Sequence, residues 1–551
     1  MKHVKRNLPT KLLLFAIILL AGFFRFYNLN WDLGHFFHPD ERNIAMGVAN
    51  ITLFSQMDPK FYAYGGFLIY LYKGTADIAS LLLNNDFFSK DWAYINVLGR
   101  HYSAFFSTLT LLPLFLLVEK LFSKKTAFIT AALYALCVSS IQTAHFSITE
   151  NILTLLLLLI TLLAVYFHEK PRILLLCSIG ILLGIGVATK TTGLSFFLIP
   201  GIMLLFTLLK KRLSFFSTFL SGILLLLIAG TLFTLFSPFT FLNWEEFSRS
   251  MNFENEVVLG INPVVYTLQF TGTLPYLFQL KNLFWQIGPV FLFSLFGLIL
   301  YLRTFWKTKN LPLLLVAAFP IMYFLYVGSW HTKFIRYMVP LIPFFLILIS
   351  LALTWILERY KHFGKAILIL SLVISFLWTL AFFSIYHRPQ TRIAASEWIY
   401  KNVEPGSMIV SEHWDEGLPI PLTSGTPEDY ILNQLTIYEP DTLEKVAYYA
   451  DILATADYVT ITTRRLYGTL MHLPEKYPLT SEYYHLLFAG SLGYEKVAEF
   501  SSYPSLLGFI INDDSSEETF QVYDHPRSII FKNTKRLNPE EIQRILLPAL
   551  E

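Results

Sequence analysis

Apolar runs of about 20 residues recur along residues 1–385, and each is long enough to cross the hydrocarbon core of a bilayer as a helix. The pattern predicts a polytopic α-helical membrane protein with about eleven transmembrane helices. The predicted spans lie near residues 11–27, 101–121, 126–144, 150–167, 173–189, 191–209, 214–236, 283–302, 311–329, 338–357 and 366–385. Two long connections, 28–100 and 237–282, separate some of these spans.

The pattern changes after residue 385, where Asp, Glu, Ser and Pro become frequent and apolar positions alternate with polar ones. We therefore expect a transmembrane domain over 1–385 and a separate soluble α/β domain over 386–551. In that domain the pattern predicts helices and short strands. We interpret the Tyr-rich segment 480–494 as part of the domain's core. The helices lie at 391–402, 441–455 and 538–549, and the strands at Met408–Ser411, Tyr458–Thr462 and Ser528–Phe531.

Composition supports a membrane protein, because 54% of the 551 residues are hydrophobic and 15% are charged. The formal net charge of +3 is too small to indicate a nucleic-acid partner. Both cysteines, Cys137 and Cys177, lie inside apolar runs, so neither a disulfide framework nor a thiolate metal site is expected.

Basic residues are concentrated in alternate connections, as the positive-inside rule requires of cytoplasmic loops. This alternation predicts a multi-pass protein of the plasma membrane with a cytoplasmic N-terminus. Both long loops and the C-terminal domain are then extracytoplasmic. The basic positions are the N-terminus, Lys120, Lys124, Lys125, Lys170, Arg172, Lys210, Lys211, Arg212, Arg303, Lys307, Lys309, Arg359, Lys361 and Lys365.

A dense group of ionisable residues, His38-Pro39-Asp40-Glu41-Arg42, follows the first span. Charges beside lipid are costly and usually functional, which makes Asp40 a candidate general base with Glu41 beside it. Pro39 followed by two acids is equally typical of a helix N-terminus, so a purely structural role stays open. His38 and, further along the loop, Tyr64 are candidate substrate-binding side chains.

A second acidic position, Glu150, lies in a short turn between two apolar runs, on the same predicted face as Asp40. We include it as a catalytic candidate. The alternative is local, because Thr149 could cap the following helix with Glu150 in its first turn.

Several cations lie on the predicted outer face, where the positive-inside rule disfavours them. Such charges would suit a phosphate leaving group, whereas any one of them alone could simply reach the lipid headgroups. Arg25, near the end of the first span, is expected to pair with a loop acid. The candidate phosphate-binding residues are Arg100, Lys190, Lys333 and Arg336, with Tyr337 as a further substrate contact.

Carboxylates, cations and an apolar groove on one face are what glycosyl transfer from a lipid-linked donor requires. A polyprenyl-lipid transporter or flippase is the alternative, although transporters place their charges near the bilayer midplane, often within inverted repeats. A catalytically inactive scaffold that presents the external domain is a third interpretation.

Several of these motifs together resemble the membrane glycosyltransferases of the GT-C superfold, in particular the family 39 type related to protein O-mannosyltransferases and aminoarabinose transferases. Others are similar to a prokaryotic branch of that type. The first group comprises Asp40-Glu41, Gly99-Arg100…Ser103, Lys190-Thr-Thr-Gly193 and Lys333…Arg336-Tyr337…Pro340 with Pro343. The second comprises Trp31-Asp32, Tyr64-Gly65, Gln269-Phe-Thr-Gly272-Thr-Leu-Pro275-Tyr276 and Glu517…Val522-Tyr-Asp-His-Pro526.

The resemblance implies an inverting hexosyltransferase that moves a sugar, mannose or a related hexose, from a polyprenyl-phosphate donor to a protein, lipid or glycan acceptor. Asp40 would be the base, supported by Glu41, and the cations would bind the donor phosphate. The resemblance leaves a divalent metal open, with His145, Glu150 and Asp40 as its candidate ligands.

Overall fold

The computed structural model describes residues 2–550, with side chains from Thr10 onward. It contains two compact units, which we describe separately. The helical unit comprises Met1–Leu259 and Leu274–Leu380, and the C-terminal unit comprises Gly260–Thr273 and Ala381–Glu551. The segment 260–273 therefore groups with the C-terminal unit, although it lies within a loop between apolar helices in the sequence.

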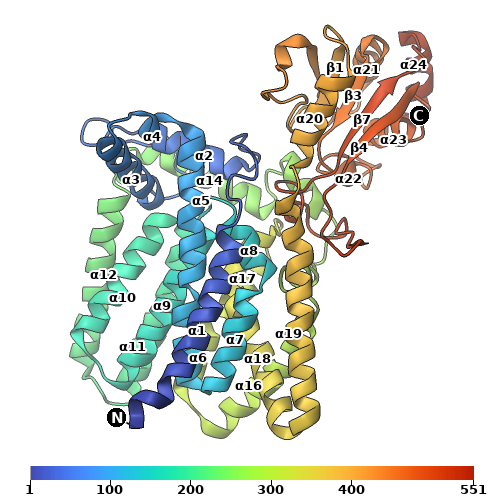
Figure 1. Ribbon diagram of the computed structural model, residues 1–551. Helices are drawn as coiled ribbons and strands as arrows, with labels where there is room; N and C mark the ends of the chain where they lie inside the picture. Colours follow the sequence, from blue (N-terminus) through green and yellow to red (C-terminus); the bar gives the residue numbers. More distant parts are fainter. Residues whose placement is uncertain (1, 551) are drawn as a thin grey trace. The chain divides into compact units, whose positions relative to one another are not determined.

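The helical unit is a bundle of apolar helices with shorter helices at one end (Figure 1). Its longer helices are α1 (Lys2–Phe26), α3 (Phe67–Leu83), α5 (Trp92–Leu109), α6 (Leu111–Leu121), α7 (Lys124–Ala135), α9 (Glu150–Glu169), α10 (Ile173–Thr189), α11 (Leu198–Leu209), α12 (Phe215–Phe236), α14 (Trp244–Leu259), α15 (Leu277–Ile287), α16 (Phe293–Thr308), α17 (Leu311–Gly328), α18 (Ile342–Arg359) and α19 (Lys361–Phe383). The short ones are α2 (Pro39–Ala49), α4 (Phe87–Lys90), α8 (Val138–Ala144) and α13 (Phe239–Leu242).

Each predicted apolar run is helical over most of its length, which confirms a polytopic membrane protein. Within residues 2–550, eight helices are long and apolar enough to span a bilayer, or nine if the pair α7 and α8, bent by 50°, is one span. The prediction of about eleven also counted α1 and α10. At 1.5 Å per residue, the 17 residues of α10 extend over about 26 Å, slightly less than a hydrocarbon core.

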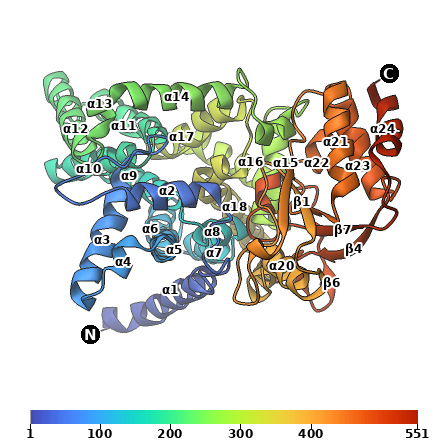
Figure 2. The same cartoon turned by 90° about the horizontal axis from the view of Figure 1, so that it is seen from above.

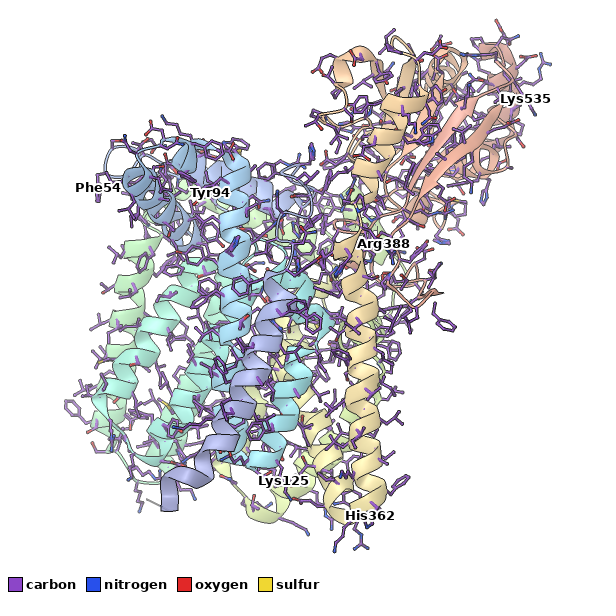
Figure 3. All side chains as sticks on the ribbon, viewed as in Figure 1. Phe54, Tyr94, Lys125, His362, Arg388 and Lys535 are labelled. Carbon is purple, nitrogen blue, oxygen red and sulfur yellow. The ribbon has the colours of Figure 1, made fainter. Side chains whose placement is uncertain are left out.

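The predicted cytoplasmic loops gather at one end of the helical unit. Lys125 and His362 lie at that end, and Phe54 and Tyr94 lie at the opposite end (Figure 3). Ion pairs connect the ends of separate helices there, since Lys120 Nζ lies 2.7 Å from Glu169 and Lys125 Nζ lies 3.1 Å from Glu358. The short helices α2 and α4 lie at the other end, which we call the loop end (Figure 1).

The C-terminal unit is built on a five-stranded mixed sheet of order β2-β1-β3-β7-β4. Strand β1 (Met408–Glu412) pairs in parallel with β2 (Ile431–Leu435) and β3 (Tyr458–Ile461). Strand β7 (Ser528–Asn533) is antiparallel to β3 and to β4 (Tyr494–Phe500). A separate hairpin is formed by β5 (Ser505–Leu506) and β6 (Phe509–Ile510).

Helices cover both faces of this sheet, as predicted for an α/β domain (Figure 2). Apolar side chains of α21 (Leu443–Thr455), α23 (Pro478–Phe488) and α24 (Pro539–Leu546) form a core with one face, and α20 (Thr391–Asn402) covers the other. Helix α22 (Tyr467–Leu470) is a single turn. Tyr483, Tyr484 and Tyr494 are fully buried in this core, which confirms the interpretation of segment 480–494.

Candidate functional site

Asp40 lies in the first turn of α2, at the loop end of the helical unit. Pro39 occupies the first helical position, where its missing N–H costs nothing. The buried His38 is the N-cap residue, and its Nδ1 accepts a hydrogen bond from the Asp40 N–H at 3.3 Å. Burial lowers the pKa of His38 to about 4, so the ring is neutral at pH 7 and Nδ1 can accept. His38 thus positions the start of α2, and its role in substrate binding stays a prediction.

The Asp40 carboxylate forms an ion pair with Arg336, which lies in a 3₁₀ helix, η4 (Ile335–Leu341), leading into α18. The hydroxyl of Tyr64 also donates a hydrogen bond to Asp40. Burial by itself would raise the pKa of Asp40, but Arg336 and neighbouring donors outweigh it and hold that pKa below its ordinary value. The carboxylate is therefore ionised and able to accept a proton.

Arg336 keeps donor capacity beyond this ion pair. One terminal nitrogen contacts Asp40, and within the described chain the buried Nε has no hydrogen-bond partner. The guanidinium lies 5.2 Å from the ring centre of Phe334 and 5.9 Å from that of Tyr337. A guanidinium held on aromatic rings with an unused donor is suited to bind an oxyanion such as phosphate.

A second ion pair adjoins the first. Lys190 Nζ lies 2.9 Å from a carboxylate oxygen of Glu150, the first residue of α9, and 4.8 Å from the ring centre of Tyr64. The charge of Lys190 acts on Asp40 as well. The structure thus brings Asp40, Tyr64, Glu150, Lys190 and Arg336 into one cluster, which we call the charged cluster.

Glycine contacts explain how Tyr64 reaches Lys190. The Gly65 N–H donates to the Thr189 carbonyl at 3.0 Å, one residue before Lys190. A Cβ at Gly65 would lie 2.0 Å from the Ala188 carbonyl oxygen, so only glycine permits this approach of the loop to α10. The next residue, Gly66, donates to the Ser237 hydroxyl at 2.9 Å.

Glu41 points away from Asp40 and into a second, fully buried set. Successive side chains on a helix diverge by about 100°, which separates the two acids. Glu41 accepts from Arg100 Nε at 2.8 Å and from Arg100 Nη2 at 2.7 Å, and it also accepts from the Ser147 N–H at 2.5 Å. Burial raises the pKa of Glu41, and Arg100 opposes that rise.

Arg100 uses all five of its N–H donors in this set. Besides Glu41, it donates to Asp32 at 2.9 and 2.7 Å and to the Leu29 carbonyl at 2.8 Å. Its guanidinium lies 4.7 Å from the ring centre of Trp31. No donor remains for a phosphate, so this geometry favours a positioning role for Arg100, which ties the loop after α1 and the helix α2 to α5.

Lys333 lies apart from the ion pairs described so far, and its predicted phosphate-binding role stays a prediction, whereas the surroundings of Arg25 differ from those predicted. The Lys333 ammonium donates to the His331 carbonyl at 2.7 Å, and burial lowers its pKa. Arg25 was expected to pair with a loop acid, but it donates hydrogen bonds to the Ser107 hydroxyl and to the carbonyls of Ala21, Tyr134 and Ala135. That expectation is wrong because α7 ends beside Arg25 and leaves carbonyl groups that need donors.

His145 does not join Asp40 and Glu150 in a ligand set. Its two ring nitrogens each lie 2.8 Å from a backbone carbonyl oxygen, that of Ile141 and that of Tyr27. Across residues 2–550 no group of three or more His, Cys, Asp and Glu side chains is arranged to hold a metal ion.

Glu254 on α14 is a member of this neighbourhood that the sequence did not single out. Glu254 remains accessible to solvent, but the protein around it displaces enough water to raise its pKa, and the charges of Arg336, Asp40 and Lys190 act on it. A helix rich in Glu and Asn is typical of an ordinary solvated helix, so nothing in the sequence indicated that Glu254 lies near the charged cluster.

Comparisons with known proteins agree with this architecture. The family model of dolichyl-phosphate-mannose-protein mannosyltransferases matches residues 96–240. A crystal structure of the oligosaccharyltransferase of Archaeoglobus fulgidus in complex with zinc and sulfate superposes with a TM-score of 0.53 at 15% identity, covering 86% of this chain and 71% of that one. No curated protein matches the chain.

A second structure of the A. fulgidus enzyme, in complex with an inhibitory peptide and a dolichol-phosphate, gives a TM-score of 0.51 at 14% identity, covering 91% and 75% of the two chains. ArnT from Cupriavidus metallidurans bound to undecaprenyl phosphate aligns over 96% of this chain and 99% of its own, with 14% identity and a TM-score of 0.47. The chain has the GT-C fold of membrane glycosyltransferases, which confirms the resemblance that its motifs predicted.

Proposed function

We propose that this protein is a glycosyltransferase that moves a sugar from a polyprenyl-phosphate donor to a protein, lipid or glycan hydroxyl at the extracytoplasmic face of the plasma membrane. The observation that carries the proposal is the contact between Asp40 and Arg336, which come from opposite ends of the helical unit's sequence. A candidate base and a candidate phosphate ligand therefore share one site, in which Arg336 lies at the end of a candidate membrane span.

The proposed step is a direct, inverting displacement. Asp40 accepts the proton of the acceptor hydroxyl while the acceptor oxygen bonds to the anomeric carbon. The bond between that carbon and the phosphate oxygen breaks, and its electron pair leaves with the polyprenyl phosphate. Arg336 and Lys190 stabilise the negative charge that develops on the phosphate. Tyr64 and Tyr337, beside these cations, would contact the sugar.

If the donor phosphate replaced Asp40 as the partner of Arg336, donor binding would make Asp40 a stronger base. A donor phosphate competes with Asp40 for the guanidinium, because both are anionic oxygen acceptors. Once Arg336 turns to the phosphate, Asp40 loses its strongest cationic partner and its pKa rises. The base then becomes stronger only when the donor is present.

The location of the charged cluster supports an enzyme over a transporter. Glu150 begins α9, Lys190 follows the last residue of α10, and Arg336 precedes α18, so the charges lie at helix ends. A transporter would be expected to carry such groups near the bilayer midplane.

Three comparisons bear on the donor and acceptor. The matching family model describes protein mannosyltransferases, which favours a hexose such as mannose. One solved neighbour holds a dolichol-phosphate, which favours a polyprenyl carrier. A further A. fulgidus structure is tethered to an acceptor peptide, so a protein acceptor is included here.

The purified protein in lipid nanodiscs, incubated with a panel of polyprenyl-phosphate sugars and acceptor extracts, tests this function. We expect release of polyprenyl phosphate and a mass increase of one sugar on an acceptor, both with a subset of donors. Movement of intact donor across vesicle membranes without release of polyprenyl phosphate would contradict the proposal and favour the flippase.

A further inference from the structure

The β5–β6 hairpin exposes a continuous apolar tip. Leu507 is 91% exposed, Phe509 80% and Ile510 70%, whereas the C-terminal unit buries most of its other large apolar side chains. Four apolar residues therefore lie within a six-residue hairpin, counting Leu506 of β5. An exposed patch of this kind on a folded domain usually marks a surface that contacts a partner or a membrane.

The backbone of the tip is held in a conformation that leucine rarely adopts. Leu507 has φ +51° and Gly508 φ +86°, as in a two-residue type I′ turn, in which asparagine or glycine is favoured at the first position. Placing leucine there costs turn stability and leaves its side chain in solvent. The sequence therefore has an apolar side chain at a position where asparagine would give a more stable turn.

The hairpin is fastened to the end of a membrane helix. Helix α19 ends at Phe383, and the 3₁₀ turn η5 (Ser384–His387) follows directly. The Ser505 N–H donates to the Ser384 hydroxyl at 3.1 Å. Arg388, at the end of this turn, donates to the Tyr503 carbonyl at 3.1 Å, to the Ser384 hydroxyl at 3.1 Å and to the Ser505 hydroxyl (Figure 3 labels Arg388).

These contacts fix the position of the tip relative to the last turn of α19, residues 381–383, which belongs to the same unit as the hairpin. Helix α19 is the apolar first part of the candidate span Lys361–Asn402. Its 23 residues extend over about 35 Å, slightly more than a hydrocarbon core, so its end should lie near the outer boundary of that core. Leu507 is two residues from Ser505, which is roughly 7 Å at 3.3 Å per strand residue. The headgroup region beside the hydrocarbon core is about as deep as that distance.

We propose that the tip of the β5–β6 hairpin inserts into the outer interface of the bilayer and anchors the C-terminal unit to the lipid surface. The partner is the lipid bilayer itself, because α19 crosses it and the hairpin is bonded to the residue after α19. Leu507 and Phe509 would reach the acyl boundary, while Arg388 and Ser384 hold the base of the hairpin at the headgroups. The proposal depends on the membrane span and is independent of the transfer reaction.

Site-directed spin labelling of the full-length protein in phosphatidylcholine–phosphatidylglycerol nanodiscs tests this anchor. Cys137 and Cys177 are first replaced by alanine, and a nitroxide is then attached at Leu507→Cys or, as a matched control in the same unit, at the exposed Lys535→Cys. We expect the label at 507 to relax faster with oxygen, which partitions into lipid, than with a water-soluble nickel complex. The label at 535 should show the reverse.

A second measurement separates insertion from folding of the turn. Leu507→Asn keeps a residue that suits the left-handed position and removes the apolar side chain. With the label moved to Ile510→Cys, this variant should shift its preference from oxygen toward the nickel complex several-fold. Equal access of both relaxing agents at 507 and 535 would overturn the proposal, and so would exclusion of both agents at 507, which would indicate a protein partner.

Discussion

Asp40 shares its carboxylate between a guanidinium and a phenol, and this sharing determines its strength as a base. Arg336 and Tyr64 hold the pKa of Asp40 below its ordinary value against the effect of burial. A low pKa keeps the base ionised at every physiological pH but makes it a weak proton acceptor. Removal of the guanidinium should therefore change the pH dependence of the reaction as well as its rate.

Arg336→Gln should move the acidic limb of the pH profile of kcat/KM upward. In the free wild-type protein that limb reports Asp40 and should lie below about pH 4, the usual pKa of aspartate. Without the guanidinium, burial is no longer outweighed, so the pKa of Asp40 rises and the limb moves to higher pH with it. Arg336→Lys, which keeps the charge, is the control and should leave the limb near its original position. An unmoved limb in Arg336→Gln would show that Asp40 does not limit the rate.

Arg100 should prove to be a structural residue. Arg100→Met leaves Asp32 and Glu41 as buried carboxylates without a counter-charge, which should cost about 3–5 kcal/mol in the free energy of unfolding. Chemical unfolding in detergent measures this loss. The double variant Glu41→Gln with Arg100→Met should lose less than the sum of the single variants, since each removes the same interaction. A raised KM for the donor with unchanged stability in Arg100→Met would instead support the phosphate-binding role that the sequence suggested.

At the scale of elements, the loop after α2 is shaped by its contact with α10. Gly65 lies against the Ala188 carbonyl and places Tyr64 over Lys190 and beside Asp40. The position of Tyr64 therefore depends on a neighbour that has no side chain.

Gly65→Ala should displace this loop, because the new methyl group would overlap backbone that cannot yield cheaply. We expect a loss of stability of about 1–3 kcal/mol and a fall in kcat/KM of at least tenfold. Gly74→Ala is the matched control, since nothing lies within 4 Å of a Cβ at that helical position of α3. That variant should gain up to about 1 kcal/mol in stability and keep its activity. Equal effects of the two variants would argue against the role of Gly65.

Most helices and strands of the protein were predictable, because the spacing of apolar residues and the position of turn residues are local features of the sequence. Pro39 correctly indicated the start of α2, and the predicted strands β1, β3 and β7 all have buried, apolar sequences. Strands β2 and β4 were missed. Both are edge strands with mostly exposed side chains, so neither shows the apolar alternation that marks a half-buried strand.

The arrangement of the candidate site was predictable only in part. The sequence placed Asp40, Glu150, Lys190 and Arg336 on one face, and the structure brings these four together. The sequence could not predict that Glu41 pairs with Arg100 while Asp40 pairs with Arg336. The choice of partners depends on how α2 is rotated against α5. Glu254 reaches the cluster through the packing of α14, which no local pattern encodes.

At the scale of the whole molecule, the C-terminal unit also contains a buried charged group. The C-terminal unit holds His525 between two carboxylates, with Nδ1 2.5 Å from Asp524 and Nε2 2.7 Å from Asp513. Burial opposes the protonated ring, but Asp524 and Asp513 raise the pKa of His525 to about 10. The imidazolium is therefore a fixed cation at neutral pH.

This raised pKa predicts a pH-dependent stability of the C-terminal unit. A group whose pKa is higher in the folded state stabilises fully below its unfolded pKa of about 6.5, and that contribution is lost as pH rises toward 10. The Tm of this unit should fall across that window. His525→Gln should melt lower at pH 6 and lose most of the pH dependence, whereas the exposed His472→Gln should match the wild-type protein. A Tm that is flat between pH 6.5 and 10 in the wild-type protein would contradict the assignment.

The central claim for the whole molecule is that Asp40 removes the acceptor proton at a site shared with Arg336. The most direct test compares turnover by wild-type protein and Asp40→Asn in the same nanodiscs, with release of polyprenyl phosphate as the readout. Asp86→Asn, an exposed acid of the same loop region, is the control. We predict a loss of about 10²–10⁴-fold for Asp40→Asn with an unchanged Tm, and full activity for Asp86→Asn. Turnover by Asp40→Asn at the wild-type rate would contradict the account.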